Sequence, residues 1–515
     1  MRIPANPTSI RLLATRAPNQ ATSTTPTKID PGRRRRVSLV GAALVIASSI
    51  IGLDVQGPAR SAEASASSSA RPSSVARPAR RPNVVLILTD DQRADTLHVM
   101  PAVRQLIAGK GVTFTDALVT NPLCCPSRAT ILTGQFSHST RVYGNYEPHG
   151  GWPTFERSGA ERRTIARALD LAGYRTGLFG KYLNHYSEAP AAYVPPGWDR
   201  WFVFSQVNGS FYNYRTFDNI HGTRLHGSAP ADYSTDVIRA KAVKFIRTTP
   251  RGTPFFLMLT PYAPHEPSTA APRHEGRFGG AAVDLGPAFT EDVSDKPGYI
   301  SSEPEAAVSK MIERTRDQWE SLLAVDEMVR RIFNVLAETG RVRNTLFIFT
   351  SDHGISNGQH HWRHKIAPYE EAIRIPLLIR YQAGGVVAGR ISNALAANVD
   401  LAPTIADFAG VAMPFAEGRS LRGVLTGRSR DIRGALLLEH ATAAGTTVPG
   451  YCGIRTHRFM YARYADGFEE LYELISDPNE LENLVSAPDL EPTRSELEAR
   501  VRNLCSPRPP GFAFA

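Results

Sequence analysis

Short runs of apolar residues recur along the chain, and each is followed by polar residues. The clearest run, at residues 83–88, reads Asn-Val-Val-Leu-Ile-Leu, and further runs lie at 175–179, 253–259, 345–350 and 375–380. Unbroken apolar runs of this length are typical of strands that are buried on both faces of a parallel sheet. The pattern therefore predicts an α/β fold with a buried central sheet.

Segments with helical spacing lie between these runs. Residues 316–338 have apolar side chains three and four positions apart, which predicts a long amphipathic helix that ends at Gly340. A shorter segment of the same kind, 163–172, ends at Gly173. The sequence has no internal repeat.

Acidic residues follow two of the predicted strands. Asp90 and Asp91 come just after the run at 83–88, and Asp352 and His353 come just after the run at 345–350. Ligand sites in open α/β sheets collect at the carboxyl ends of the strands. Adjacent aspartates buried at a strand end are costly unless a cation is bound, and the alternative is a solvated turn.

Two lysines and a histidine are also found near predicted strand ends. Lys181 follows the run at 175–179, and His265 lies in a Pro-His-Glu-Pro segment after the run at 253–259. Lys365 lies in a loop rich in histidine. Taken alone, the two lysines would be ordinary solvated loop residues.

The stretch Leu-Cys-Cys-Pro-Ser-Arg, at 123–128, combines two thiols with a helix start. Pro126 suits the first helical position and Gly134 suits the end of a short helix, so Cys124 is predicted at a helix N-terminus. Arg128 would lie about one turn further on, which brings a guanidinium to a helix end that favours anions. Two buried thiols, or a disulfide between neighbours, would also explain these residues.

The composition, 42% hydrophobic and 21% charged over 515 residues, is that of a globular protein with a large core. The net charge is +10, but residues 1–64 carry nine Lys and Arg against three Asp and Glu. Arg71, Arg77 and Arg80 account for three more positive charges. Residues 81–515 are therefore close to neutral, and we expect no nucleic-acid partner.

The N-terminal region is predicted to be an export signal. The cluster Arg33–Arg36 precedes the apolar stretch Val37–Leu53 and an Ala-Glu-Ala motif at 62–64. Residues 1–64 are therefore interpreted as a signal peptide, of the Sec or the twin-arginine type, and residues 65–80 as a flexible linker. We expect a secreted or cell-surface protein, with an uncleaved membrane anchor as the alternative.

The residues around Cys124 resemble the sulfatase family, whose motif is Cys-x-Pro-x-Arg. Only Cys124 has this spacing, because a serine rather than a proline stands two residues after Cys125. The resemblance implies an alkaline-phosphatase-like fold, with a large mixed, mostly parallel sheet sandwiched by helices in a catalytic domain at 81–430. It also implies a smaller C-terminal subdomain with an antiparallel sheet at 431–515.

The resemblance implies a modified residue and a metal. In this family the formylglycine-generating enzyme oxidises the motif cysteine, here Cys124, to formylglycine. The metal is usually Ca²⁺, and the imidazole ligand leaves Mg²⁺ or Mn²⁺ open. The implied metal ligands are Asp90, Asp91, Cys124, Asp352 and His353.

The resemblance also implies catalytic roles. Arg128, Lys181 and Lys365 would hold the sulfate oxygens. Asp352 would be the base for the hydroxyl of residue 124 that attacks sulfur, and His265, helped by Lys365, would protonate the leaving alcohol.

One feature of the family is missing. Many sulfatases have a histidine two residues after the lysine that matches Lys181, but this chain has Leu183 there. Asn184, His185 or the separate His138 would have to take its place. We assign His138 and Asn184 to substrate binding.

The likeness is strongest to N-acetylglucosamine-6-sulfatases, and it extends to Gly-Lys-Tyr-Leu-Asn at 180–184, Trp198 and Tyr-Asn-Tyr at 212–214. It implies a sulfated carbohydrate or small sulfate ester as substrate, with 6-O-sulfated N-acetylglucosamine preferred. We expect these segments around the mouth of the pocket. The aromatic residues between 195 and 214 suit sugar stacking and a packed hairpin equally well.

Other activities share the same motifs. A phosphodiesterase or phosphonate monoester hydrolase has the same fold and the Cys-x-Pro-x-Arg motif, and an arylsulfatase of broad specificity would have the same catalytic set. A non-catalytic carbohydrate-binding relative is disfavoured, because every charged position of the motif set is filled. The sequence leaves the oligomeric state open.

An exported member of this family is also expected to contain a disulfide between Cys452 and Cys505. As in N-acetylglucosamine-6-sulfatases, cysteines lie beside Tyr451 and near the C-terminus. An exported protein meets an oxidising environment, Cys124 would be consumed by modification, and Cys125 is expected to be buried. Cys452 and Cys505 then remain to form a disulfide with each other.

Overall fold

The central strand of the protein is β1 (Asn83–Thr89), and all seven of its residues are buried. In this computed structural model, which describes residues 81–205, 210–442 and 446–514, β1 lies between β9 (Thr345–Ser351) and β8 (Phe255–Thr260) and runs parallel to both. β4 (Arg175–Gly180) and β5 (Arg200–Phe204) continue the parallel sheet beyond β8. The predicted buried parallel strands are confirmed.

Antiparallel strands at both edges make the sheet mixed. Within the described residues it has ten strands in the order β11-β2-β10-β9-β1-β8-β4-β5-β6-β7. β10 pairs antiparallel with β9 and β2, and β6 pairs antiparallel with β5 and β7. β3 and β12 form a separate parallel pair. The bounds of these strands are β2 (Val112–Phe114), β3 (Ala117–Leu118), β6 (Arg215–Asp218), β7 (Gly222–Leu225), β10 (Leu377–Arg380), β11 (Arg390–Ser392) and β12 (Ala396–Ala397).

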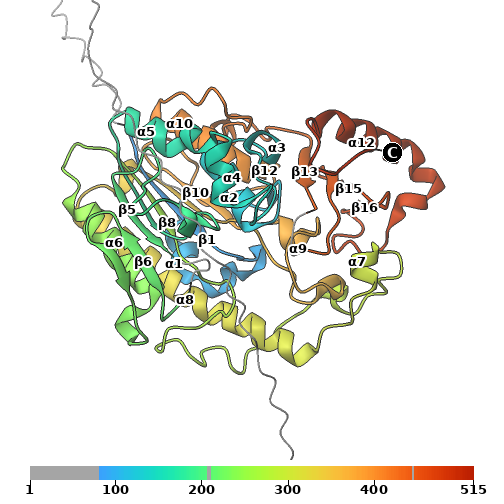
Figure 1. Cartoon of the computed structure of the whole chain (residues 1–515), viewed down its shortest axis with the longest axis horizontal. Coiled ribbons are helices and arrows are strands. Elements are labelled where there is room, and N and C mark those ends of the chain that lie inside the picture. The colour runs from blue at the N-terminus through green and yellow to red at the C-terminus, as the bar shows by residue number, and fades with distance from the viewer. Residues whose placement is uncertain (1–80, 206–209, 443–445, 515) are drawn as a thin grey trace, which may run out of the picture. The chain divides into compact units, whose positions relative to one another are not determined.

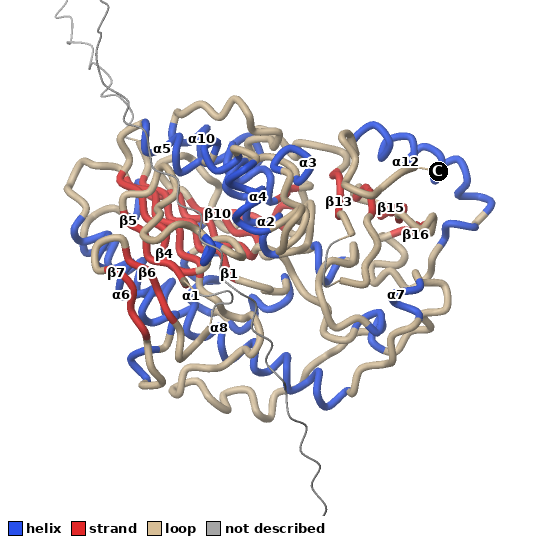
Figure 2. Tube along the Cα trace, viewed as in Figure 1, coloured by secondary structure: helices blue, strands red, loops and turns tan. Residues whose placement is uncertain are grey.

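Helices cover both faces of this sheet (Figures 1 and 2). Alternate residues of β1 point to opposite faces, so Val84, Leu86 and Leu88 pack in one apolar cluster while Val85 and Ile87 pack in another. The first cluster includes residues of α2 (Cys124–Thr133), α4 (Gly151–Arg157), α5 (Ile165–Leu171) and α10 (Leu401–Ala409). The second includes residues of α1 (Pro101–Leu106), α6 (Ser234–Thr248) and α8 (Val308–Glu338).

The long predicted helix is α8, and it is longer than the pattern indicated. It begins at Val308 rather than at residue 316 and ends two residues before Gly340. The additional residues include Val308, Met311 and Ile312 at helical spacing, so the apolar pattern begins earlier than the segment that we assigned to the helix. Four further α-helices have four residues each: α3 (Ser137–Thr140), α7 (Gly298–Ser301), α9 (Glu370–Ile373) and α11 (Arg422–Leu425).

A second, smaller sheet lies near the C-terminus (Figure 1). Its antiparallel strands are β13 (Leu436–His440), β14 (Tyr451–Arg455), β15 (Phe459–Tyr464) and β16 (Glu469–Glu473). α12 (Glu491–Leu504) packs Leu497 and Val501 against one face of this sheet, and a disulfide joins Cys452 to Cys505. The predicted fold class and the predicted disulfide are confirmed.

The small sheet and the large one belong to a single compact unit, Ala76–Ala515. The boundary predicted at residue 430 falls in the segment between α11 and β13. The signal peptide and linker predicted for residues 1–80 lie outside the described residues. Within the described residues, no helix has the length and apolar character that a membrane span needs.

The aromatic residues between 195 and 214 are part of the core. Trp198 stacks on Phe256 with ring centroids 5.5 Å apart, and Trp201 is fully buried. Tyr214 is also buried, 5.4 Å from the ring of Phe204. Our expectation that Trp198 and the segment 212–214 surround the pocket mouth is therefore corrected for Trp198 and Tyr214, because burial of their large apolar rings stabilises the sheet edge instead.

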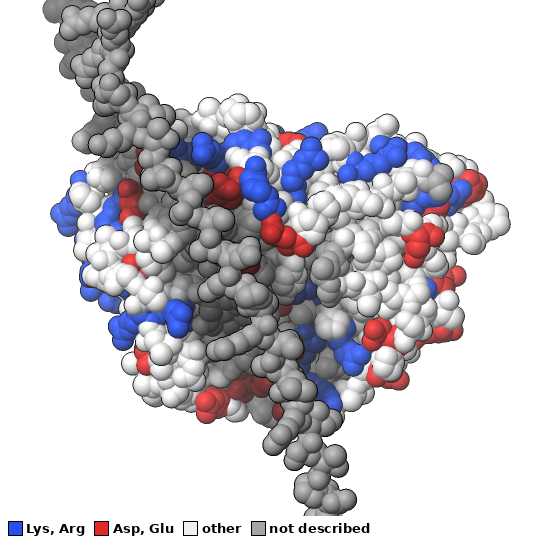
Figure 3. Space-filling view, in the orientation of Figure 1, with Lys and Arg blue, Asp and Glu red and all other residues white. Residues whose placement is uncertain are grey.

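The face seen in Figure 3 is mostly white, with separate patches of Lys and Arg and of Asp and Glu scattered over it. This distribution agrees with the near-neutral charge balance of residues 81–515. It gives the visible surface no extended field of one sign.

We predict that the Cys452–Cys505 disulfide is a major stabilising element. It closes a loop with a sequence separation of 53 residues, for which the chain-entropy relation gives about 4 kcal/mol. The Cys452→Ser/Cys505→Ser double variant should therefore show a free energy of unfolding lower by about this amount in denaturant titrations. Alkylation of both cysteines in the native, unreduced protein would contradict the bond itself.

Candidate active site

Cys124 is the first residue of α2, which begins directly after an extended residue, Leu123. The helix ends at Gly134, whose φ of +69° is in the left-handed region that favours glycine. Pro126 is the third helical residue rather than the first, in the turn where a missing N–H costs no hydrogen bond. All ten residues of α2 are buried, so Cys124 is held rigidly below the surface.

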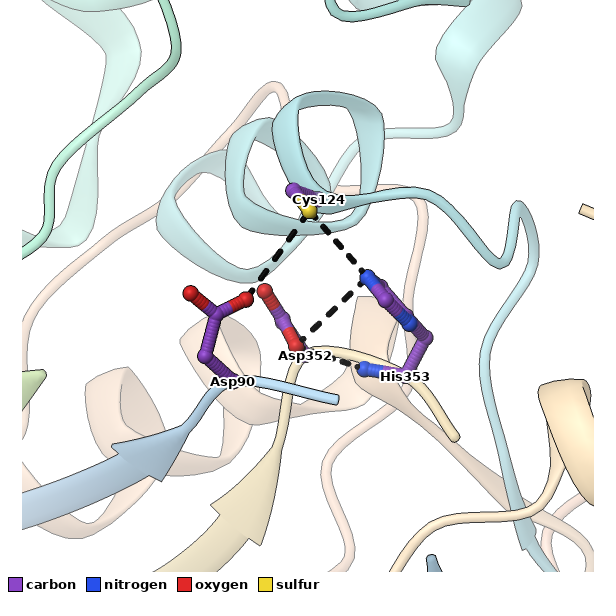
Figure 4. Close-up of side chains that lie close together, drawn as sticks. All are labelled: Asp90, Cys124, Asp352 and His353. Carbon is purple, nitrogen blue, oxygen red and sulfur yellow. Dashed lines mark hydrogen bonds and ion pairs between the residues drawn. The ribbon is translucent and has the colours of Figure 1, made fainter. Parts of the chain in front are cut away.

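Two strand ends meet at Cys124 (Figure 4). Asp90 follows β1, and Asp352 and His353 follow β9. One ligand atom of each of these three residues and the sulfur of Cys124 lie within 4.8 Å of one another. Asp91 completes the group, with a carboxylate oxygen 3.2 Å from His353 Nε2.

Three cationic side chains neutralise these carboxylates. Arg128 Nε donates to Asp352 Oδ2 at 2.8 Å, and Lys181 Nζ donates to Asp90 Oδ2 at 2.6 Å. Lys365 Nζ contacts Asp91 Oδ1 at 2.8 Å and Cys124 Sγ at 3.2 Å. The structure thus brings together every residue that we predicted as catalytic or metal-binding. His265 is included, because one of its ring nitrogens lies within 4.8 Å of ligand atoms of Asp90, Asp91 and Cys124.

Lys181 is positioned by a glycine that no other residue can replace. Gly180 ends β4 with a φ of +126°, and a Cβ there would lie 2.0 Å from the carbonyl oxygen of Thr260 in β8. Strands β4 and β8 therefore come together without a side chain between them. The chain then turns toward Asp90.

The cations control the ionisation of the cluster. Burial raises the pKa of Asp90, but Lys181 and Arg128 outweigh it and hold this pKa well below its usual value. Burial also opposes ionisation of Cys124, yet Lys181 and Lys365 lower the pKa of its thiol. At Cys125 burial dominates and raises the pKa to about 12. The two neighbouring thiols therefore differ in character, and only Cys124 is activated.

His353 is suited to bind a cation through Nε2. Its Nδ1 lies 2.8 Å from the carbonyl oxygen of Gly354, which fixes the proton on Nδ1 and leaves Nε2 facing Cys124 Sγ at 3.4 Å. Burial lowers the pKa of His353, but Asp352 and Asp91 outweigh it and raise this pKa to about 9. The carboxylates and this imidazole fit a divalent cation.

His265 lies at the rim of the cluster. Its Nε2 is 3.7 Å from Asp91 Oδ2, its ring stacks on Tyr262, and its side chain is 25% exposed. Burial lowers its pKa despite Asp91, so the ring is neutral near neutral pH. A neutral, partly exposed imidazole is able to exchange protons with a ligand and with solvent.

Asn184 and His138, which we assigned to substrate binding, have different surroundings from one another. The backbone oxygen of Asn184 accepts from Trp152, and its side-chain oxygen is buried without a hydrogen-bond partner. His138 lies between Glu439, whose Oε2 is 3.1 Å from Nδ1, and Glu417, whose Oε1 is 3.7 Å from Nε2. These contacts give His138 a structural position between α3 and β13.

The structure adds residues that the sequence did not single out. A cavity of about 370 Å³ opens beside Lys365. Its wall includes Tyr146, half of whose side chain is exposed, together with Trp362 and His364. His364 was adjacent to a predicted residue, but nothing in the local pattern pointed to Tyr146. The other lining residues are Leu123, Asn145, Glu303, Ile366, Thr446 and Thr447.

Comparison with known families decides the affiliation of the chain. The model of the sulfatase family matches residues 82–411. The chain belongs to the sulfatase family. A second model, described as the C-terminal part of N-sulphoglucosamine sulphohydrolase, matches residues 358–506 of this sulfatase. Family membership makes the protein a sulfuric ester hydrolase.

Named relatives agree. The N-acetylglucosamine-6-sulfatase of Homo sapiens is 32% identical over 464 residues, which is 81% of this sulfatase and 83% of the relative. An extracellular sulfatase SULF-1 homolog of Drosophila melanogaster is 36% identical over 367 residues; the match covers 69% of this sulfatase but only 32% of that longer protein.

A solved structure is similar throughout. It is a complex with its substrate, D-glucosamine-2-N,6-O-disulfate, and has a TM-score of 0.73 at 26% sequence identity. The match covers 82% of this sulfatase and 97% of that chain. The similarity therefore includes both sheets.

We predict that His138 stabilises the fold as a cation. Burial lowers its pKa, but hydrogen bonds to Glu417 and Glu439 raise it to about 9, above the value of about 6.5 in an unfolded chain. The stabilisation is complete below pH 6.5 and is lost as the pH rises through about 9. In denaturant titrations His138→Gln should cost about 1.5–3 kcal/mol at pH 6 and much less at pH 10.

The kinetics of the same variant give the control. A raised KM with an unchanged free energy of unfolding would return His138 to substrate binding. An equal loss of stability at both pH values would show that packing, and not charge, is responsible.

Proposed function

We propose that this sulfatase removes the 6-O-sulfate of N-acetylglucosamine, or of a closely related sulfated glycan. The observation that carries the proposal is the cluster around Cys124, where an activated side chain, three cations and a divalent-cation donor set adjoin a cavity with aromatic walls. The N-acetylglucosamine-6-sulfatase relatives and the solved complex with a disulfated glucosamine support the same substrate class.

The cluster would work with two groups that the chain acquires. A divalent cation held by Asp90, Asp91, Asp352 and His353, with Ca²⁺ the first candidate, would neutralise the carboxylates and lower the pKa of a hydroxyl beside them. Conversion of Cys124 to formylglycine by a formylglycine-generating enzyme, followed by addition of water to the aldehyde, would supply two hydroxyls on one carbon. The thiol sulfur of Cys124 marks the position of the reacting oxygen.

Three cations would hold the anionic substrate. With the carboxylates neutralised, Arg128, Lys181 and Lys365 are free to donate to sulfate oxygens around residue 124. Their charges oppose the build-up of negative charge as the ester bond breaks. Arg128 and Lys181 are buried, and Lys365 is 17% exposed and paired with Asp91, so all three are oriented before the substrate arrives.

Proton transfer is assigned to two residues on opposite sides. Asp352, fixed by Arg128 and by the backbone N–H groups of Asp91 and His353, would accept the proton of the attacking hydroxyl. His265 would donate to the leaving alcohol. An anionic sulfate near its ring favours the protonated form, which compensates for the effect of burial on its pKa.

The cavity beside Lys365 is the proposed sugar site. Tyr146, Trp362 and His364 offer ring faces, while Glu303 and Asn145 offer polar groups for hydroxyl or amide contacts. This replaces the aromatic segment near residue 200 as the source of sugar contacts. We further propose export through the N-terminal signal, and a division into a catalytic part at 81–430 and a C-terminal part at 431–515.

We predict that Cys124→Ala abolishes turnover of 4-nitrophenyl sulfate, whereas Cys125→Ala keeps most of it. Only Cys124 has the motif spacing and contacts Lys365, and Cys125 is a fully buried neutral thiol. Circular dichroism should show both variants folded, and the intact mass should report conversion of residue 124. An active Cys124→Ala protein would refute the assignment of the nucleophile.

We predict that N-acetylglucosamine-6-sulfate is preferred over 4-nitrophenyl sulfate by about tenfold or more in kcat/KM. Each buried polar group left unpaired by a mismatched ligand costs about 1–3 kcal/mol, so a matched sugar is favoured. Galactose-6-sulfate is the control for the sugar itself. An aryl ester that is hydrolysed equally well would indicate a broad arylsulfatase, and faster turnover of an aryl phosphonate would indicate a phosphonate monoester hydrolase.

A further inference from the structure

A second group of ligand-type side chains lies apart from the cluster at Cys124. His360, Glu371 and Glu480 each offer a donor atom, and these atoms lie within 4.8 Å of one another. They come from three segments: the loop after β9, α9, and the turn after β16 of the small sheet. His360 and Glu480 are fully buried, and the side chain of Glu371 is 13% exposed.

The donor atoms of this group lack hydrogen bonds. Among the described residues, His360 Nε2, Glu371 Oε2 and Glu480 Oε1 are buried atoms without a hydrogen-bond partner. His360 Nε2 and Glu371 Oε2 form an ion-pair contact at 3.3 Å. Buried polar atoms that lack hydrogen bonds are costly, and three of them on one small group suggest a bound species that contacts all three.

The remaining atoms of the same side chains are occupied. His360 Nδ1 lies 2.6 Å from Glu291 Oε1, and Glu480 Oε2 accepts from the backbone N–H of Glu370 at 2.8 Å. A carboxylate on Nδ1 fixes the imidazole tautomer with its lone pair on Nε2, as at protein metal sites. The free atoms are thus the ones available for a ligand.

We propose that His360, Glu371 and Glu480 bind a structural divalent cation, zinc or manganese, separate from the cation at Asp90. One imidazole nitrogen and two carboxylate oxygens form a three-residue donor set that suits these ions, with water completing the coordination. Bond lengths of about 2.0–2.2 Å require only a small contraction of the group.

The cation would join the small sheet to the active-site loop. Glu480 lies just after β16, and its backbone oxygen accepts from Lys296. His360 lies in the same loop as His353 and Lys365, both of which contact Cys124. Binding at this site would therefore stabilise the loop that carries two active-site residues.

Zinc content tests the proposal. Asp90→Asn, which removes a donor of the active-site cation, serves as the background. In this background, chelated protein that is dialysed against Zn²⁺ should bind about one equivalent with high affinity. Adding Glu480→Gln, which keeps an acceptor for the Glu370 N–H, should remove that equivalent, whereas the exposed control Glu482→Gln should not.

Two further measurements use the Asp90→Asn protein with Glu480 in place. Their results therefore do not depend on whether the Glu480→Gln variant folds. Zinc should raise the melting midpoint of the chelated protein by about 3 °C at a hundredfold excess over Kd. Calorimetry in buffers of different ionisation enthalpy should report proton release on binding, because metal ligands bind in their deprotonated form. Equal zinc content with and without Glu480→Gln, or no proton release, would overturn the proposal and leave the three side chains as a group without a metal.

Discussion

Buried carboxylates at the ends of neighbouring parallel strands impose the strongest constraint on this molecule. Asp90, Asp91 and Asp352 have almost no exposed surface, and anions in such a place are tolerated only with cations in contact. Arg128, Lys181 and Lys365 supply these cations from three other elements. The position of α2, the end of β4 and the loop after β9 are therefore all tied to the same three carboxylates.

This arrangement suits the catalytic role that we propose for the site. The cations that compensate the aspartates in the free chain are the groups that a sulfate ester requires, and the carboxylates are the ligands that a divalent cation requires. When a metal and an anion bind, the carboxylates would contact the metal and the cationic side chains would contact the anion, in place of one another. Few side chains would need to move, which is the condition for strong electrostatic stabilisation of a transition state.

Sequence patterns were sufficient to predict those site residues whose positions depend on a few neighbouring residues. The strand ends with Asp90 and Asp352, and the helix start at Cys124, followed from runs and spacing of a few residues, and these predictions agree with β1, β9 and α2. The burial of Trp198 could not be predicted in this way, because a tryptophan that packs in the core and one that stacks on a sugar look the same in the sequence.

The long-range contacts could not be predicted for a different reason. His138 owes its position to Glu417 and Glu439, which lie about 280 and 300 positions further along the chain. Tyr146 lines the cavity because distant loops fold beside it. No local pattern encodes such pairings, and the fold has to be known first.

The order in which the chain is synthesised gives these contacts a further meaning. Cys124, in the first third of the chain, is only 1% exposed once folded, yet its surroundings depend on residues made much later, such as Glu439 beside Thr120 and Glu480 beside Glu370. The core around the thiol cannot close until nearly the whole polypeptide has emerged. The modifying enzyme that we propose for Cys124 would thus have to act before this closure. Shortening the C-terminus would extend the time available to it while leaving the finished site incomplete.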